Sequence, residues 1–133
     1  MKKRTCIMAI DDEEEILRLL KSILEPEGYD FVGATGGEAA FSLWRERQPD
    51  LILLDIMMPG LDGFQVLDLI RRKSDVPVIM LTGQSEVTAL RDSVEIGADD
   101  YIRKPFYPLE LVARIRAKLR RVAQSRAALH PGA

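Results

Sequence analysis

The stretch LILLDIMMPGLDG, residues 51–63, decides the fold of this chain. Four apolar residues, 51–54, run directly into one acid, Asp55, and Pro-Gly and Asp-Gly pairs close the stretch. A short apolar run between turn residues is typical of a strand that is buried on both faces, as in parallel sheets. Because an ionised carboxylate is costly inside a core, Asp55 is predicted at the carboxyl end of this strand, where ligands bind in open α/β sheets.

Strand and helix patterns alternate five times along the chain. This alternation predicts an α/β fold of the flavodoxin-like, doubly wound kind, with a five-stranded parallel sheet of order 2-1-3-4-5 and five helices. The domain is expected over residues 1–122, and residues 123–133 are expected to form a C-terminal tail or the start of a linker, since the helical pattern is lost there. Besides 51–55, strands are predicted at 6–10, 29–34 (an edge strand), 76–81 and 101–102, and a weak fourth helix is marked by Val87, Leu90 and Val94.

Length, composition and charge indicate an ordinary globular domain. The 133 residues are 47% hydrophobic and 30% charged, enough for one core. A net charge of −2 gives the chain as a whole no nucleic-acid signature, and no apolar run approaches the roughly 18 residues of a membrane span. Cys6 is the single cysteine, which excludes an internal disulfide and fits a reducing compartment, so a cytoplasmic location is expected.

Chemically useful side chains end four of the five predicted strands. Asp11 and Asp12 follow the first strand, Asp55 ends the third, Thr82 the fourth and Lys104 the fifth. The carboxyl ends of parallel strands share one edge, so we expect these side chains to converge. Clustered carboxylates repel unless a cation lies among them, and their oxygens suit Mg²⁺. With an ammonium group and a hydroxyl donor beside them, the set predicts phosphoryl transfer to the Asp55 carboxylate.

Four stretches, AIDDEEEI, LILLDIMMPGLDGF, PVIMLTG and GADDYIRKPF, together resemble the receiver domain of two-component response regulators, over residues 5–122. The resemblance implies a signalling switch and not an enzyme, in which Asp55 accepts a phosphoryl group from the phosphohistidine of a sensor histidine kinase or from a small acyl phosphate. It implies that Mg²⁺ is held by Asp11, Asp12, Asp55 and the backbone carbonyl of Met57.

The same resemblance assigns roles to the other end-of-strand residues. Lys104 would contact a phosphate oxygen, and its bond to Pro105 would be cis. Thr82 would move toward the phosphoryl group, and Tyr101 would turn inward into the space that Thr82 leaves, so that a local charge change biases a two-state element.

The last third, GADDYIRKPFYPLELVARIRAKLRR, resembles the winged-helix, DNA-binding branch of response regulators. This implies a homodimer on phosphorylation, formed through helix four, strand five and helix five, and a transcriptional output, with DNA bound only through a possible missing C-terminal domain. Self-complementary charges suit a two-fold interface, but the same charges can also be a helix face exposed to solvent. We expect the arginines of 114–121 to form an interface or such a solvated face, and not a DNA-binding patch. The candidate interface residues are Glu95, Asp99, Asp100, Glu110, Arg114, Arg116 and Arg121.

Several alternatives stay open. Asp11-Asp12 can also cap a helix, and Asp62-Gly63 is expected to be a turn and cap. Competing functions are a stand-alone receiver acting through protein–protein contacts, a flavin or nucleotide binder (no glycine-rich phosphate motif supports it) and an aspartyl-nucleophile phosphatase of the haloacid dehalogenase kind. Phosphatases of this kind have a second acid two residues after the nucleophilic aspartate, and this chain has Met57 at that position. We interpret the side chains of Cys6, Trp44, Met57 and Met58 as packing residues.

Overall fold

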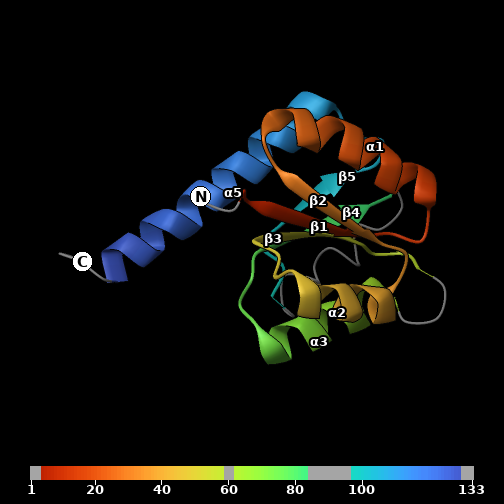
Figure 1. Ribbon diagram of the computed structural model, residues 1–133, viewed down its shortest axis with the longest axis horizontal. Helices are drawn as coiled ribbons and strands as arrows, with labels where there is room; N and C mark the ends of the chain where they lie inside the picture. The colour runs from red at the N-terminus through yellow and green to blue at the C-terminus, as the bar shows by residue number, and fades with distance from the viewer. Residues whose placement is uncertain (1–3, 59–61, 84–96, 130–133) are drawn as a thin grey trace.

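Five parallel strands form one sheet in the order β2-β1-β3-β4-β5 (Figure 1). This computed structural model describes residues 4–58, 62–83 and 97–129. The predicted α/β class, parallel pairing and strand order are confirmed. The strands are β1 (Cys6–Ile10), β2 (Asp30–Ala34), β3 (Leu51–Asp55), β4 (Val78–Thr82) and β5 (Asp100–Arg103).

The three central strands owe their place to their apolar sequences. Every residue of β1, β3 and β4 is buried, whereas β2, predicted as an edge strand, is only partly buried. Side chains alternate across each strand, so Met8 and Ile10 of β1 enter one core while Ile7 and Ala9 enter the other. The sheet is therefore the middle layer between two apolar cores.

Among the described residues, helices cover both faces of the sheet (Figure 1). Helices α1 (Glu14–Leu24) and α5 (Pro108–Leu129) pack on one core, and α2 (Gly37–Glu46) and α3 (Gly63–Lys73) pack on the other. A short 3₁₀ turn, Glu25–Glu27, ends α1 at Gly28, whose φ of 97° suits glycine. The predicted fourth helix lies outside the described residues. Among the described helices, none is both long enough and apolar enough to cross a membrane.

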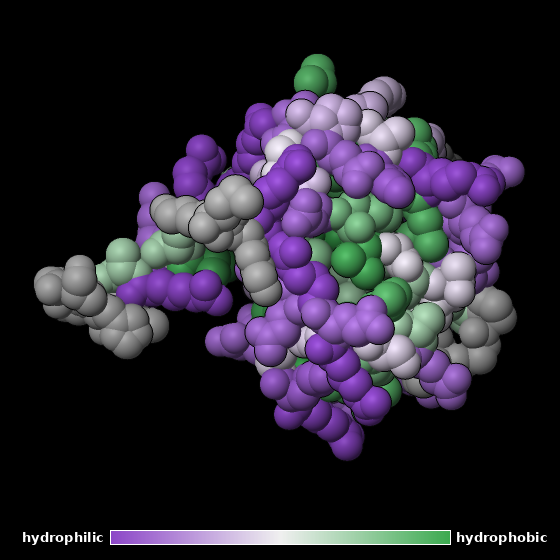
Figure 2. Space-filling model, viewed as in Figure 1, coloured by the Kyte–Doolittle hydropathy of each residue, from purple (hydrophilic) through white to green (hydrophobic). Residues whose placement is uncertain are grey.

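Helix α5 is longer than predicted. The expected loss of helical structure near residue 124 is wrong, because α5 continues to Leu129. Residues 123–129 read AQSRAAL, in which all but the serine are good helix formers and neither glycine nor proline occurs, so the backbone stays helical although the apolar pattern has ended. Residues 123–127 are exposed, and this end of α5 projects away from the sheet (Figures 1 and 2). The domain boundary after residue 122 stays a prediction.

The start of α3 is set by a local signal that the sequence contained. The Asp62 carboxylate accepts a hydrogen bond from the backbone N–H of Gln65, and the Gln65 side chain accepts one from the backbone N–H of Asp62. This capping box confirms the predicted turn and cap. Gly63 adds a constraint, because a Cβ placed there would lie 2.2 Å from the backbone oxygen of Asp55. Helix α3 thus packs directly on the end of β3 that carries Asp55.

Candidate functional site

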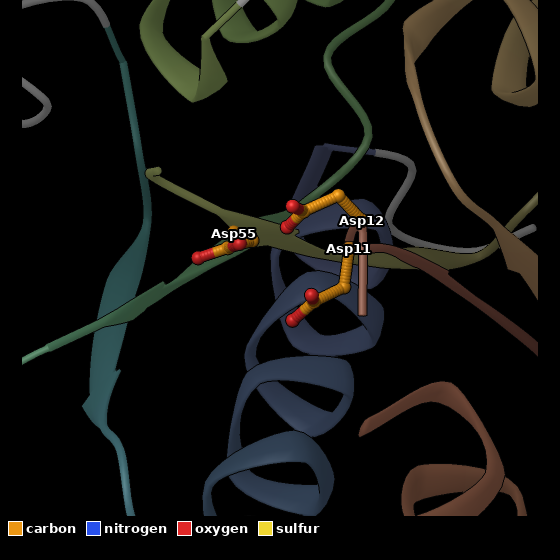
Figure 3. Close-up of side chains that lie close together, drawn as sticks. All are labelled: Asp11, Asp12 and Asp55. Atoms are coloured by element: carbon orange, nitrogen blue, oxygen red, sulfur yellow. The ribbon is translucent and has the colours of Figure 1, made fainter. Parts of the chain in front are cut away.

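Three carboxylates from the ends of β1 and β3 meet at one edge of the sheet. One carboxylate oxygen of each of Asp11, Asp12 and Asp55 lies within 4.8 Å of the others. Figure 3 shows all three carboxylates pointing to the same side. Asp11 is fully buried, Asp55 is 5% exposed and Asp12 is exposed. The predicted convergence of these residues is confirmed, and the cluster has both a buried end and an end open to solvent.

Lys104 brings the one cation that contacts these acids within the described residues. It directly follows β5, and its bond to Pro105 is cis, as the resemblance implied. Its Nζ donates to Asp11 Oδ2 at 2.7 Å and lies 3.3 Å from Asp55 Oδ1. Lys104 therefore contacts two of the three acids, Asp11 more closely than Asp55.

The protonation of the cluster follows from this packing. Burial, together with the charge of Asp11, raises the pKa of Asp55 to about 6, and Lys104 and the backbone N–H of Met57 oppose that rise. Burial alone would lower the pKa of Lys104. Its hydrogen bond to Asp11 and the negative charges of Asp11 and Asp55 outweigh burial, so the pKa of Lys104 lies above its ordinary value. Near neutral pH the Asp55 carboxylate is therefore mostly ionised beside a protonated Lys104.

The donor set fits a divalent cation. Three carboxylates set against one ammonium group leave an excess of two negative charges, and this excess is what a divalent ion would neutralise. Hard oxygen donors with one member open to water match the coordination that Mg²⁺ prefers. The alternative that Asp11-Asp12 caps the helix is wrong, because the N-cap of α1 is Glu13 and no side chain caps the first turn. Asp11 Oδ1 instead accepts from the backbone N–H of Glu13 at 2.9 Å, ahead of the helix.

The remaining predicted site residues are Thr82, Tyr101 and Met57. Thr82 ends β4, next to β3, and is fully buried, with its Oγ1 donating to the backbone oxygen of Gly83 at 3.1 Å. Tyr101 in β5 is 44% exposed. Met57 lies two residues after Asp55, and its side chain is 65% exposed, so interpreting it as a packing residue is wrong. The reason is its place in the loop that leaves β3; Cys6, Trp44 and Met58 are buried as expected.

Most of the predicted interface charges are paired within the chain. Arg114 contacts Asp100 and Glu110, both at 3.1 Å. Arg116 Nη2 lies 2.6 Å from Glu27 Oε2, which joins α5 to the end of α1. Glu95 lies outside the described residues, and Arg121 is exposed.

Asp99 has a structural place that the sequence did not reveal. Its carboxylate accepts from the Val78 backbone N–H at 2.7 Å and from Arg71 Nη2 at 2.9 Å, and it lies 2.8 Å from Lys118 Nζ. Arg71 also donates to the backbone oxygen of Gly97 at 2.8 Å. Asp99, which directly precedes β5, thus connects the start of that strand to α3, β4 and α5. No local signal could have shown this, because the partners are far apart in the sequence.

Comparison with known proteins agrees with this geometry. The family model described as the response regulator receiver domain matches residues 7–116. A protein named "Probable transcriptional regulator ycf27" from Porphyridium aerugineum is 52% identical over 116 residues, which cover 87% of this chain and 48% of that protein. The "DNA-binding response regulator MtrA" of Mycolicibacterium paratuberculosis is 44% identical over 118 residues, 89% of this chain and 52% of that protein. The chain thus spans about half the length of these relatives.

Solved structures share the fold over nearly the whole chain. The receiver domain of NtrX from Brucella abortus superposes with a TM-score of 0.81 at 32% identity, covering 86% of this chain and 98% of that one. A two-component response regulator from Clostridium difficile gives 0.84 at 30% identity, covering 89% and 98%. The aspartate cluster at the strand ends, the sheet order and the matched family model lead to one conclusion: this chain belongs to the response regulator receiver domain family.

Proposed function

We propose that the chain is a phosphoacceptor switch in which Asp55 receives the phosphoryl group. The observation that carries this proposal is the convergence of Asp55 with Asp11, Asp12 and Lys104 at one edge of the sheet. An oxygen of Asp55 attacks phosphorus, the P–N bond to a kinase histidine breaks, and the freed ring nitrogen keeps the electron pair of that bond. The product is an acyl phosphate on β3.

Each neighbour has a task in that transfer. Asp55 is mostly ionised above pH 6, the state that a nucleophile requires. Asp11, Asp12 and Asp55, with the backbone carbonyl of Met57, would hold Mg²⁺, which neutralises charge on the transferred group when it is bound. Lys104 would contact a phosphate oxygen, since its Nζ lies 3.3 Å from Asp55 Oδ1.

The switch proposal extends to Thr82 and Tyr101. Thr82 is buried beside β3 and Tyr101 lies half out of β5, so a shift of the Thr82 hydroxyl toward a phosphoryl group would open room for the Tyr101 ring. The charge change at Asp55 would in this way alter the surface formed by β5 and α5.

The partners follow from the family. We propose a sensor histidine kinase as the phosphoryl donor, a cytoplasmic location and a homodimer as the output form, with transcription controlled through a DNA-binding domain that would follow residue 133. A stand-alone receiver acting through protein–protein contacts is the alternative. The intrachain pairs of Arg114 and Arg116 mean that a dimer using these residues has to exchange existing ion pairs for new ones.

The direct test is intact-protein mass measurement after incubation with acetyl phosphate and Mg²⁺. We expect one labile phosphoryl adduct, which is absent in Asp55→Asn and retained in Asp68→Asn, a control with the same charge change on an exposed site of α3. Chelation of Mg²⁺ should abolish the adduct. An adduct that persists in Asp55→Asn would refute the assignment, and steady hydrolysis of a phosphomonoester would instead favour the phosphatase.

A further inference from the structure

Strand β2 forms one edge of the sheet, and the outer side of its backbone has no partner strand among the described residues. The backbone N–H of Asp30 and the backbone oxygen of Ala34 form hydrogen bonds of 2.9 and 3.0 Å with residues that flank β1. Because backbone groups alternate in direction along a strand, those of Phe31 and Gly33 point to the opposite side. Two N–H and two C=O groups of β2 therefore face outward, away from the sheet.

This edge lacks the features that commonly protect an exposed strand from pairing with another chain. Such edges often contain proline, lysine or a bulge. Strand β2 reads DFVGA, with none of these residues, and its register with β1 is unbroken. Figure 2 shows apolar atoms where β2 lies in Figure 1, with hydrophilic atoms around them. The edge is therefore suited to accept one more strand.

A hollow of about 340 Å³ lies beside this edge, and we call it the α1–β2 hollow. Leu17 of α1 and Phe31 of β2 line it with apolar atoms. Gly33 keeps it open, since a Cβ at this position would lie 3.2 Å from the Phe31 ring and 3.5 Å from Leu17. Phe31 and Gly33 are two positions apart and share one face of the sheet. A strand added to β2 would therefore place every second side chain on the side of the hollow.

The rim of the α1–β2 hollow adds a charge preference. Arg18 and Lys21 of α1 line it together with one acid, Glu14. Both basic side chains are exposed, and neither forms an ion pair with an acid of the described residues. They are three positions apart, so they lie on neighbouring turns of the same helix face. An occupant that brings a carboxylate next to its apolar side chain would complement these two cations.

We propose that β2 is a docking site for an extended segment of a partner protein, which adds to the sheet as a further strand. An apolar side chain of that segment fills the α1–β2 hollow, and a carboxylate two positions away contacts Arg18 and Lys21. The outward backbone groups supply affinity, and the hollow and its cations supply the sequence preference. A second copy of the chain matches this less well, because the one acid of its β2, Asp30, already pairs with Arg47 at 3.1 Å.

The test uses two fluorescein-labelled peptides, Thr-Asp-Val-Leu-Val-Thr and Thr-Val-Leu-Val-Asp-Thr. Their Asp and Leu lie on one face of a strand in opposite orders, so the pair covers both strand directions. In fluorescence anisotropy with the 133-residue chain, we expect one of them to bind with a Kd on the order of 10⁻⁴ M. Asn in place of the peptide's Asp should weaken binding about two- to fivefold. The proposal is overturned if neither Asp peptide binds.

Two variants at one position separate the backbone contact from the side-chain contact. Gly33→Pro and Gly33→Ala both add a Cβ, but only proline removes the outward N–H, which takes no part in the ladder with β1. We expect Gly33→Pro to weaken binding about tenfold or more, and Gly33→Ala to stay within about threefold of the wild type. Equal affinities of the two variants would overturn strand addition. Far-UV circular dichroism and urea unfolding establish that both variants fold.

Amide hydrogen exchange, measured by NMR on the wild type, tests the geometry without any substitution. With peptide at about ten times Kd, exchange at Phe31 and Gly33 should slow about tenfold. Exchange at Val32, whose N–H faces β1, should not change and is the internal control. Unchanged exchange at Phe31 and Gly33 while the peptide is bound would show that it binds elsewhere, and would overturn the proposal.

The charge preference has its own matched control. Changing Arg18 and Lys21 together (R18Q, K21Q) should lower the affinity for the Asp peptide to that for the Asn peptide. Arg45 and Arg103 are also exposed, and R45Q, R103Q together should bind like the wild type; an equal loss in this control would overturn the proposed carboxylate contact. Sedimentation velocity without peptide tests the competing partner. Self-association that Gly33→Pro abolishes would overturn the proposal in favour of pairing between two copies of β2.

Discussion

Replacing Asp55 by asparagine is expected to stabilise the metal-free protein at neutral pH. In the folded chain burial and the Asp11 charge raise the pKa of Asp55 from 3.8 to about 6. Between these pH values the folded state holds a proton on this carboxyl group that the unfolded state has lost. The folding free energy therefore becomes less favourable as pH rises through this window.

The magnitude follows from the same shift. At about 1.36 kcal/mol per pKa unit, a rise from 3.8 to about 6 corresponds to about 3 kcal/mol of destabilisation by the ionised carboxylate. Asparagine keeps the size of the side chain and removes the charge, and Lys104 keeps its shorter contact to Asp11. The value is an upper limit, because the amide replaces the hydrogen bonds of the carboxylate only in part.

Urea unfolding, followed through the fluorescence of the buried Trp44 with a chelator present, measures the effect. Asp55→Asn should be more stable than wild type at about pH 7.5, and the difference should shrink toward zero near about pH 4. Added Mg²⁺ should stabilise the wild type more than the variant, since the variant lacks one ligand. Asp68→Asn, with the same charge change in an exposed ion pair, should stay within about 0.5 kcal/mol of wild type. A metal-free Asp55→Asn protein that is less stable than wild type at neutral pH would refute the electrostatic reasoning.

Three further predictions concern the surroundings of the site. Gly63→Ala should destabilise by about 3 kcal/mol or more in urea unfolding, because its Cβ would meet the backbone of β3 at 2.2 Å; loss below about 1 kcal/mol would contradict this packing. Asp99→Ala should cost about 1 to 3 kcal/mol, since the buried N–H of Val78 loses its acceptor, and an unchanged urea midpoint would count against that bond. Lys104→Ala should still form the phosphoryl adduct, more slowly, but lose phosphorylation-dependent dimerisation by sedimentation; normal dimerisation would contradict the role proposed for Lys104.

The candidate site was largely predictable because it depends on strand ends. Once the apolar runs define parallel strands, burial and right-handed crossovers leave few topologies, and every strand end falls on the same edge. Asp11, Asp12, Asp55 and Lys104 could therefore be brought together without coordinates, and the structure confirms their proximity. The roles assigned to them remain proposals.

Other features needed the folded chain. The preference of Lys104 for Asp11 joins residues 93 positions apart and is decided by a difference of 0.6 Å between two contacts of 2.7 and 3.3 Å. The contacts of Asp99 with Arg71, Val78 and Lys118 likewise join residues that are distant in the sequence. Such contacts depend on the reach and direction of single side chains, for which a sequence has no periodic signal.

The sequence by itself determined the layers, the strand order and the edge where the acids gather, because these follow from which segments are apolar and how long they are. Only the tertiary structure decided which cation serves which acid, that Met57 is exposed, and that the end of α5 extends past the sheet. The physical reason is that burial patterns act over whole segments, whereas ion pairs and exposure depend on the distances between particular atoms in the folded chain.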